Sequence, residues 1–102
     1  MVEKSLNIIW TNTAKRSLKN IYEFYYPKSK TAAQKKINEI LEKIKTIKYS
    51  EQYQVDEVDI RYRRLIVRHF KVLYSRNNET IKIHRVFDCR QNPDKLKESK
   101  DL

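Results

Sequence analysis

The sequence predicts an α+β domain in which a helical hairpin packs on one face of a small, mainly antiparallel sheet. Two observations support this prediction. Apolar residues recur at helical spacing between residues 14 and 47, and they alternate singly from about residue 62 onward. A chain of 102 residues is near the commonest domain size, so we expect residues 1–102 to form one domain. The expected order is strand, helix, helix and then three strands.

A short apolar run at residues 6–10 is expected to form a strand that leads into the first helix. Thr11 and Thr13 are both suitable N-cap residues for that helix. We expect Pro27 to end it, because proline disfavours helical geometry in the residue before it. The apolar positions between these limits share one face of a 3.6-residue period: Ala14, Leu18, Ile21, Tyr22 and Tyr25.

The second helix is expected to begin after Ser29 or Thr31, which are again suitable N-caps. Only a short linker joins the two helices, so they should form an antiparallel hairpin. We interpret the long aliphatic stripe of the second helix as core rather than as a ligand site. Its members are Ala33, Ile37, Ile40, Leu41, Ile44 and Ile47.

Three strands are expected in the second half of the chain, at residues 62–67, 70–75 and 80–88. The Arg68-His69 pair between the first two is poor chemistry for a two-residue turn, which favours Asn-Gly or a similar pair. The register there is therefore open, although His69 tolerates a positive φ better than most residues.

A two-residue turn would give these two strands one mostly apolar face and one mixed face. In that register Val67 lies opposite Phe70, Leu65 opposite Val72 and Arg63 opposite Tyr74, and this set is expected against the helices. The other face would carry Tyr62, Arg64, Ile66, Lys71, Leu73 and Ser75. Such a mixture suits an antiparallel sheet with one wetted face.

The last strand is expected to divide its side chains in the same way. Ile81, Ile83 and Phe87 would share one face, and Lys82, His84 and Asp88 the other. Strict alternation puts Arg85 on the apolar face. Either the Arg85 guanidinium extends to the edge of the sheet, or a β-bulge resets the alternation.

Composition excludes several kinds of site. The chain contains no glycine, so it lacks the Gly-rich loops that cradle phosphates in nucleotide-binding folds. One cysteine and two histidines give neither an internal disulfide nor a metal site, and we expect no cofactor. No apolar run approaches the ~18 residues of a membrane span. We therefore expect a cytoplasmic protein.

The charge balance implies an anionic partner. Lys and Arg number 23 against 13 Asp and Glu, a net charge of +10. Nucleic acid or an acidic protein would suit such a chain, and a membrane surface less so. Seven of the eight arginines lie between Arg61 and Arg90. The planar fork of arginine suits phosphate and carboxylate better than the point charge of lysine does.

A dense polar cluster, Asp88 to Asn92, follows the last strand just before Pro93. Asp88 and Arg90 can pair there and lock the strand end. Alternatively, Arg90 projects beside Arg64 and Lys71 on the wetted face, and both arrangements can hold together.

Three segments, "IIWTNTAKRSLKNIYEFY", "YRRLIVRHFKVLY" and "VFDCRQNP", resemble in order and spacing the RelE/ParE superfamily of bacterial type II toxin–antitoxin toxins. The likeness extends from residue 6 to about residue 96. It implies the same strand, helical hairpin and three-stranded sheet. It also implies a growth-inhibiting toxin that a cognate, often acidic antitoxin holds inactive.

The superfamily divides by target. RelE-like members cut mRNA in the ribosome with basic residues on the open sheet face, and Arg64, Lys71 and Arg90 match those positions, one of them as lysine. ParE-like members poison DNA gyrase. If this chain is an enzyme, the resemblance implies a metal-independent endoribonuclease.

Cleavage by a 2′-hydroxyl needs a base, an acid and cations. Related nucleases place a tyrosine, or a His-Tyr pair, beyond the last strand, and the comparable region here, residues 88–102, contains neither. His84 or Asp88 could act as the base, and Tyr62 could contribute. We therefore expect a ParE-like gyrase poison. The alternatives are a RelE-like mRNA endonuclease and a non-catalytic nucleic-acid-binding module.

Overall fold

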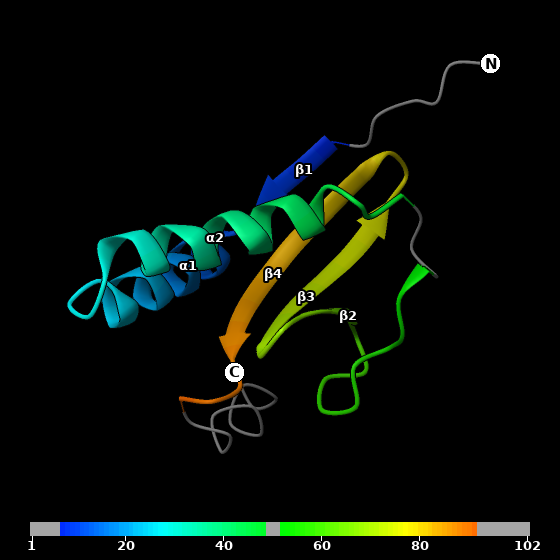
Figure 1. Cartoon of the computed structure of the whole chain (residues 1–102). Helices are drawn as coiled ribbons and strands as arrows, with labels where there is room; N and C mark the ends of the chain where they lie inside the picture. The colour runs from blue at the N-terminus through cyan, green and yellow to red at the C-terminus, as the bar shows by residue number, and fades with distance from the viewer. Residues whose placement is uncertain (1–6, 49–51, 92–102) are drawn as a thin grey trace.

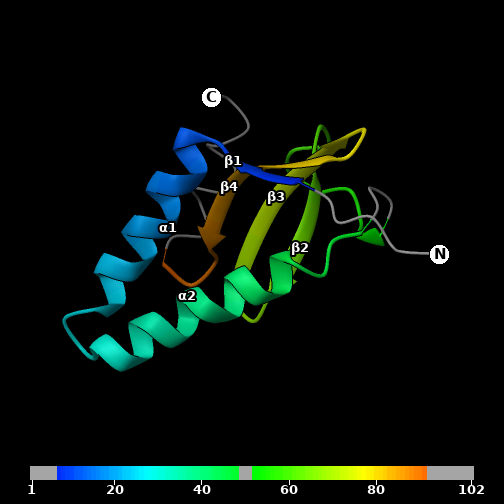
Figure 2. The ribbon, with the colours of Figure 1, turned by 90° about the horizontal axis from the view of Figure 1, so that it is seen from above.

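The computed structural model describes residues 7–48 and 52–91, and it has the predicted α+β fold. Its elements are β1 (Asn7–Trp10), α1 (Asn12–Tyr25), α2 (Lys30–Ile44), β2 (Arg63–Val67), β3 (Phe70–Asn77) and β4 (Thr80–Asp88). The four strands form one sheet in the order β1-β4-β3-β2. Strand β1 is parallel to β4, and the other neighbours are antiparallel. The two helices cover one face of this sheet (Figures 1 and 2).

Thr11 is the N-cap of α1, and Thr13 is not. The Thr11 hydroxyl accepts a hydrogen bond from the Ala14 N–H at 3.0 Å and donates one to the His84 carbonyl at 2.9 Å. The Thr11 N–H also donates to the Ile83 carbonyl. One residue therefore starts α1 and fixes that start to β4. Of the predicted first strand, residue 6 lies outside the described residues.

The turn between the helices departs in one detail from the prediction. Tyr26, which precedes Pro27, keeps helical dihedral angles (φ −55°, ψ −44°) and donates its N–H to the Tyr22 carbonyl. Proline therefore ends α1 because it has no N–H to continue the ladder, and not by changing the residue before it. Ser29 is the N-cap of α2, since its hydroxyl accepts from the Ala32 N–H at 3.1 Å.

The β2–β3 turn has the predicted two-residue length, and Val67 lies opposite Phe70. The expected pairs Leu65–Val72 and Arg63–Tyr74 are also confirmed. The residue with positive φ is Arg68 (56°), however, and not His69. Strand β3 extends two residues further than predicted, to Asn77, because the second turn contains only residues 78 and 79.

The core lies between the helices and the sheet. Its buried members are Ala14, Ile21, Ile37, Ile40, Ile44, Ile47, Leu65, Val67, Phe70, Val72, Tyr74, Ile81, Ile83 and Val86. This set contains most of the predicted stripes. Leu18, Tyr22, Tyr25 and Leu41 are only partly buried and pack against its border.

A β-bulge in β4 resets its alternation. Leu73 lies opposite Arg85, but its neighbour Tyr74 lies opposite Ile83, so His84 has no partner across the ladder. Beyond this extra residue the faces exchange, since alternate side chains in a strand point to opposite faces.

The bulge answers the question that Arg85 posed, and it corrects two other assignments. Val86 joins the core, and Asp88 lies opposite buried Phe70 on the helix side. Phe87 lies opposite Lys71 on the face that the helices leave uncovered, which we call the open face. We had expected Phe87 on the apolar face and Asp88 on the other.

The face assignments predict a sharp contrast between two neighbouring residues of β2. Leu65 is 1% exposed and Ile66 is 51% exposed. Leu65→Ala should lower the free energy of unfolding by about 2 to 5 kcal/mol, because it leaves a cavity in the core. Ile66→Ala, the matched control, should change it by no more than about 0.5 kcal/mol. Denaturant titration measures both, and equal losses would contradict the assignment.

Candidate functional site

Lys71, the predicted phosphate-binding cation of β3, is buried on the open face in an ion pair. Its ammonium lies 2.8 Å from a carboxylate oxygen of Asp56, and the two residues are only 5% and 1% exposed. The other oxygen of Asp56 accepts the N–H groups of Val58 and Asp59 at 3.1 and 2.8 Å. Lys71 therefore holds the segment before β2 in place and is not available to a phosphate.

That segment, residues 54–62, extends the sheet beside β2. Val55 forms an antiparallel bridge with Arg63, and the Arg64 N–H donates to the Gln54 carbonyl at 2.9 Å. The Arg64 guanidinium contacts the Gln54 amide at 3.2 Å and Glu57 at 3.5 Å. Its side chain is 22% exposed. Arg64 is thus the predicted cation that an open-face ligand could still reach.

His84, at the bulge, stacks on Tyr62 with 4.0 Å between ring centroids. Its Nε2 lies 2.8 Å from the Ser75 hydroxyl. Burial, assisted by the charges of Lys82 and Arg61, lowers the pKa of His84 from its ordinary value of 6.5. The structure therefore brings two weaker catalytic candidates together, with a neutral imidazole at pH 7.

The Arg61 guanidinium lies over the Tyr62 ring in a cation–π contact, with its central carbon 5.1 Å from the ring centroid. The Asp59 carboxylate holds that guanidinium through two hydrogen bonds of 2.8 and 2.6 Å. Further along the face, the Phe87 ring lies beneath both Lys71 and Arg85, at 5.3 and 5.0 Å. The open face is a set of mutually engaged side chains.

Asp88 belongs to a different cluster, between the end of α1 and the β2–β3 turn. Tyr25 donates its hydroxyl to Asp88 at 2.5 Å, and the same hydroxyl lies 3.1 Å from Nε2 of His69. The Gln91 amide and the Arg90 backbone N–H also donate to this carboxylate, both at 3.0 Å. With its side chain 2% exposed, Asp88 cannot act as a base on the open face.

Two members of this cluster have shifted pKa values. Burial, together with the Asp88 carboxylate, raises the pKa of Tyr25 to about 12. Burial lowers the pKa of His69, and the charges of Arg90, Lys36 and Arg68 act in the same direction.

The sequence did not reveal that Tyr25 and His69 lie beside Asp88. Tyr25 was assigned to the apolar stripe and His69 to a turn, and no spacing connects either residue to Asp88.

Arg90 follows the last strand and donates its backbone N–H to Asp88, whereas Lys71 is paired with Asp56 on the open face. No ion pair between the Arg90 and Asp88 side chains is found in the described residues, so only the backbone makes the expected contact. The predicted set of Arg64, Lys71 and Arg90 is therefore not one site. Asn92, the last residue of the predicted polar cluster, lies outside the described residues.

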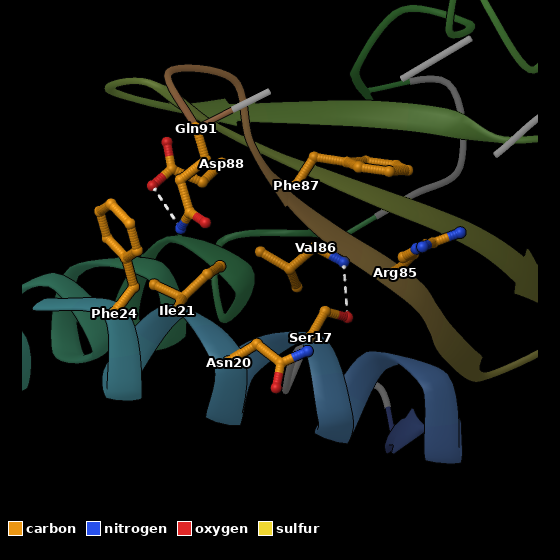
Figure 3. Close-up of a pocket in the computed structure, with 9 residues that line it drawn as sticks. All are labelled: Ser17, Asn20, Ile21, Phe24, Arg85, Val86, Phe87, Asp88 and Gln91. Carbon is orange, nitrogen blue, oxygen red and sulfur yellow. Dashed lines mark hydrogen bonds between the residues drawn. The ribbon is translucent and has the colours of Figure 1, made fainter. Parts of the chain in front are cut away.

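Figure 3 shows a cleft of about 280 Å³ between α1 and the second half of β4. Val86 points toward α1, and its N–H donates to the Ser17 hydroxyl at 3.3 Å. The Phe87 ring lies on the opposite side of the strand. The Gln91 amide at the rim is already bonded to Asp88. Of its polar lining residues, Ser17, Asp88 and Gln91 thus already make hydrogen bonds.

An apolar groove runs along the hairpin beside β1. Trp10 lies at its centre and lines two adjoining hollows of about 330 and 220 Å³. We define the Trp10 groove by its apolar residues: Ile8, Trp10, Leu18, Tyr22, Ile37 and Leu41. Lys15, Lys19 and Lys45 stand at its rim. Sequence analysis assigned these stripe residues to the core; the available signal was an apolar stripe wider than the sheet can cover.

The helical half has the larger net positive charge of the two described ranges. Residues 7–48 contain ten Lys and Arg against three acids, a net charge of +7. Residues 52–91 contain nine against five, a net charge of +4. The arginine cluster in the second half was therefore a misleading guide, since acids of the same segment neutralise much of it.

Within residues 7–48 and 52–91, no group of three or more His, Cys, Asp or Glu side chains is placed to hold a metal ion. No helix in these ranges is both long and apolar enough to cross a membrane.

Comparison with known proteins identifies relatives of this arrangement. Residues 8–93 match the family described as "ParE toxin of type II toxin-antitoxin system, parDE". Among solved structures, a chromosomal ParDE TA system from P. aeruginosa superposes with a TM-score of 0.71. That chain is 22% identical, and the match covers 82% of this chain and 96% of the other. No curated protein sequence matches significantly.

The buried ion pair generates a testable expectation. Lys71→Met should lower the free energy of unfolding by about 3 to 5 kcal/mol, because it leaves the Asp56 carboxylate buried and unpaired. The double variant Lys71→Met/Asp56→Asn should lose less than the sum of its single variants. Lys82→Met, on exposed surface of the same face, should be near neutral. If Lys71→Met proved as mild as the Lys82 control in denaturant titration, the pair would not hold the segment.

Proposed function

Because the chain belongs to the ParE toxin family of type II toxin–antitoxin systems, we propose that it inhibits growth by poisoning DNA gyrase. We take residues 1–102 as one toxin domain that works in the cytoplasm, where gyrase and the antitoxin are found. The principal alternative, shared by the wider superfamily, is cleavage of mRNA on the ribosome. The two differ in whether the open face must perform acid–base chemistry.

One observation supports the gyrase proposal most strongly: the Lys71–Asp56 pair occupies the centre of the open face. A nuclease would need free cations there to stabilise the negative charge that develops on phosphate. Lys71 is already neutralised, and Arg90 follows the last strand, with its backbone N–H bonded to Asp88. Arg64 is the matched cation that lies within the strands of the open face and is still partly exposed. A toxin that acts by docking on its target needs no such set.

The observation that favours the nuclease is the His84–Tyr62 stack with Ser75 beside it. A neutral imidazole can accept a proton from a 2′-hydroxyl. Asp88 faces the helices, so Tyr62 is the predicted candidate that remains beside His84 to protonate the leaving oxygen. Because Lys71 is neutralised, we rank RNA cleavage second.

Membership of a toxin–antitoxin family gives the chain an antitoxin partner. We propose that this antitoxin inserts apolar side chains of an acidic amphipathic segment into the Trp10 groove. Protein interfaces usually depend on a few apolar side chains that fill hollows in the partner, and tryptophan is prominent among the residues that carry the binding energy. Lys15 at the rim and the net charge of +7 over residues 7–48 complement an acidic partner. The other two rim lysines, Lys19 and Lys45, pair with Glu23 and Glu42.

The target prediction compares two readouts in induced cells. A gyrase poison should cause DNA damage and filamentation, and purified chain should trap cleaved DNA on gyrase. Messenger RNA should remain uncut in translated codons, because Lys71 on the open face is already neutralised. Mapping mRNA 5′ ends after induction provides the check. Fresh cuts within codons that disappear in His84→Gln or Arg64→Ala, while the control Ile66→Ala still cuts, would replace the proposal with the nuclease.

The antitoxin prediction concerns Trp10. Trp10→Ala should weaken antitoxin binding by at least about 2 kcal/mol, roughly 30-fold, because interface tryptophans carry a large share of binding energy. Phe24→Ala, an exposed apolar residue of α1 outside the groove, is the matched control and should bind normally. Calorimetric titration measures both. Equal affinity of the two folded variants would place the antitoxin elsewhere.

A further inference from the structure

The solvent-facing side of α2 forms a continuous polar surface. Lys30, Thr31, Gln34, Lys35 and Asn38 are all exposed and line one shallow hollow, which Glu39 and Glu42 close on the C-terminal side. Their spacing of one and three residues puts them on a single helix face. We call these five residues the α2 outer face. In Figures 1 and 2 the helix lies at the outside of the molecule, with the sheet behind it.

The lysines of this face are not neutralised by the acids nearest to them. Glu39 is held by Arg68 at 2.6 Å, and Glu42 by Lys45 at 3.2 Å. Across the described ranges, no carboxylate pairs with Lys30 or Lys35. Two positive charges thus remain free on one helix face.

The N-terminus of α2 adds to the positive charge of this face. Ser29 caps α2, and the first turn contains no acidic residue. The partial positive charge of the helix N-terminus is therefore not offset by an acidic side chain. Exposed Lys28, in the turn just before the helix, lies at the same end. Cationic groups therefore accumulate at the first half of α2.

The composition of the face distinguishes nucleic acid from protein as the anionic partner. Protein interfaces depend on aromatic or aliphatic anchors in their buried centre. In the described part of the chain the exposed large apolar residues are Ile9, Phe24, Tyr26, Val55, Ile60 and Ile66, and none lies on α2. Lysine ammonium, amide and hydroxyl groups are instead the side chains that contact phosphate oxygens.

We propose that the α2 outer face binds the phosphate backbone of duplex DNA without reading its sequence. This surface adjoins the Trp10 groove at Asn38, but the groove has the apolar anchors that this face lacks. DNA binding also goes beyond gyrase poisoning, since it requires only the charges and polar groups of α2. Association is electrostatic and releases counterions, so its affinity falls steeply with salt.

The test is a fluorescence anisotropy titration of the full-length chain against a labelled duplex of arbitrary sequence. Binding should be measurable at about 50 mM salt, and log K should fall linearly with log salt by about 0.9 per neutralised phosphate. Lys30→Gln/Lys35→Gln should reduce that slope by about 2, one for each lost phosphate contact. Glutamine is a good helix former, so α2 should keep its structure.

The matched control removes two positive charges from the open face, Lys82→Gln/Arg85→Gln, and should leave the slope unchanged. An equal or larger loss in this control would overturn the proposal and place DNA on the open face. Absence of binding at low salt would overturn it as well, as would an unchanged slope in the α2 variant. Gyrase trapping is measured separately, so failure of gyrase poisoning would not be mistaken for failure of DNA binding.

Discussion

The extra residue at His84 is the constraint on which both faces of the molecule depend. Before it, β4 sends Ile81 and Ile83 into the core; after it, Val86 takes the core side. Without the bulge, Asp88 would lie on the open face and Phe87 against the helices. With it, the carboxylate meets Tyr25 at the end of α1, and the Phe87 ring lies beneath Lys71. One inserted residue thus moves Asp88, a predicted base, away from the open face. It also brings Asp88 to Tyr25, which secures the helical hairpin to the end of β4.

The open face that results is held together by polar contacts that compete with ligand binding. A buried ion pair adds little net stability, but removing one partner leaves a costly unpaired charge. The face therefore resists any change that would free Lys71 for a ligand. No buried side-chain nitrogen or oxygen in the described residues lacks a hydrogen-bond partner. A face whose buried polar atoms all have partners suits rigid docking better than the rearrangements of a catalytic cycle.

Local periodicity was sufficient to predict the elements, the β2–β3 register and most of the core, because burial imposes one apolar face on each element. The bulge left a single trace in the sequence, Arg85 on an apolar face, and that trace had two explanations. The partner of Lys71 is Asp56, fifteen residues away in an irregular segment, and no spacing rule connects them. The Trp10 groove was invisible for a related reason. A stripe wider than the sheet can cover has the same periodicity as a stripe that is wholly core.

Residues 7–48, which contain the groove and the α2 outer face, carry a net charge of +7, against +4 for residues 52–91. Charges that share a small surface influence each other over about a Debye length, ~10 Å at ordinary ionic strength. An acidic segment seated in the Trp10 groove would therefore lower the positive potential over Lys30 and Lys35 without contacting these two lysines. Because counterion release depends on that potential, the antitoxin would weaken DNA binding together with target binding. A single acidic partner could thus silence two surfaces, while only one of them needs apolar anchors.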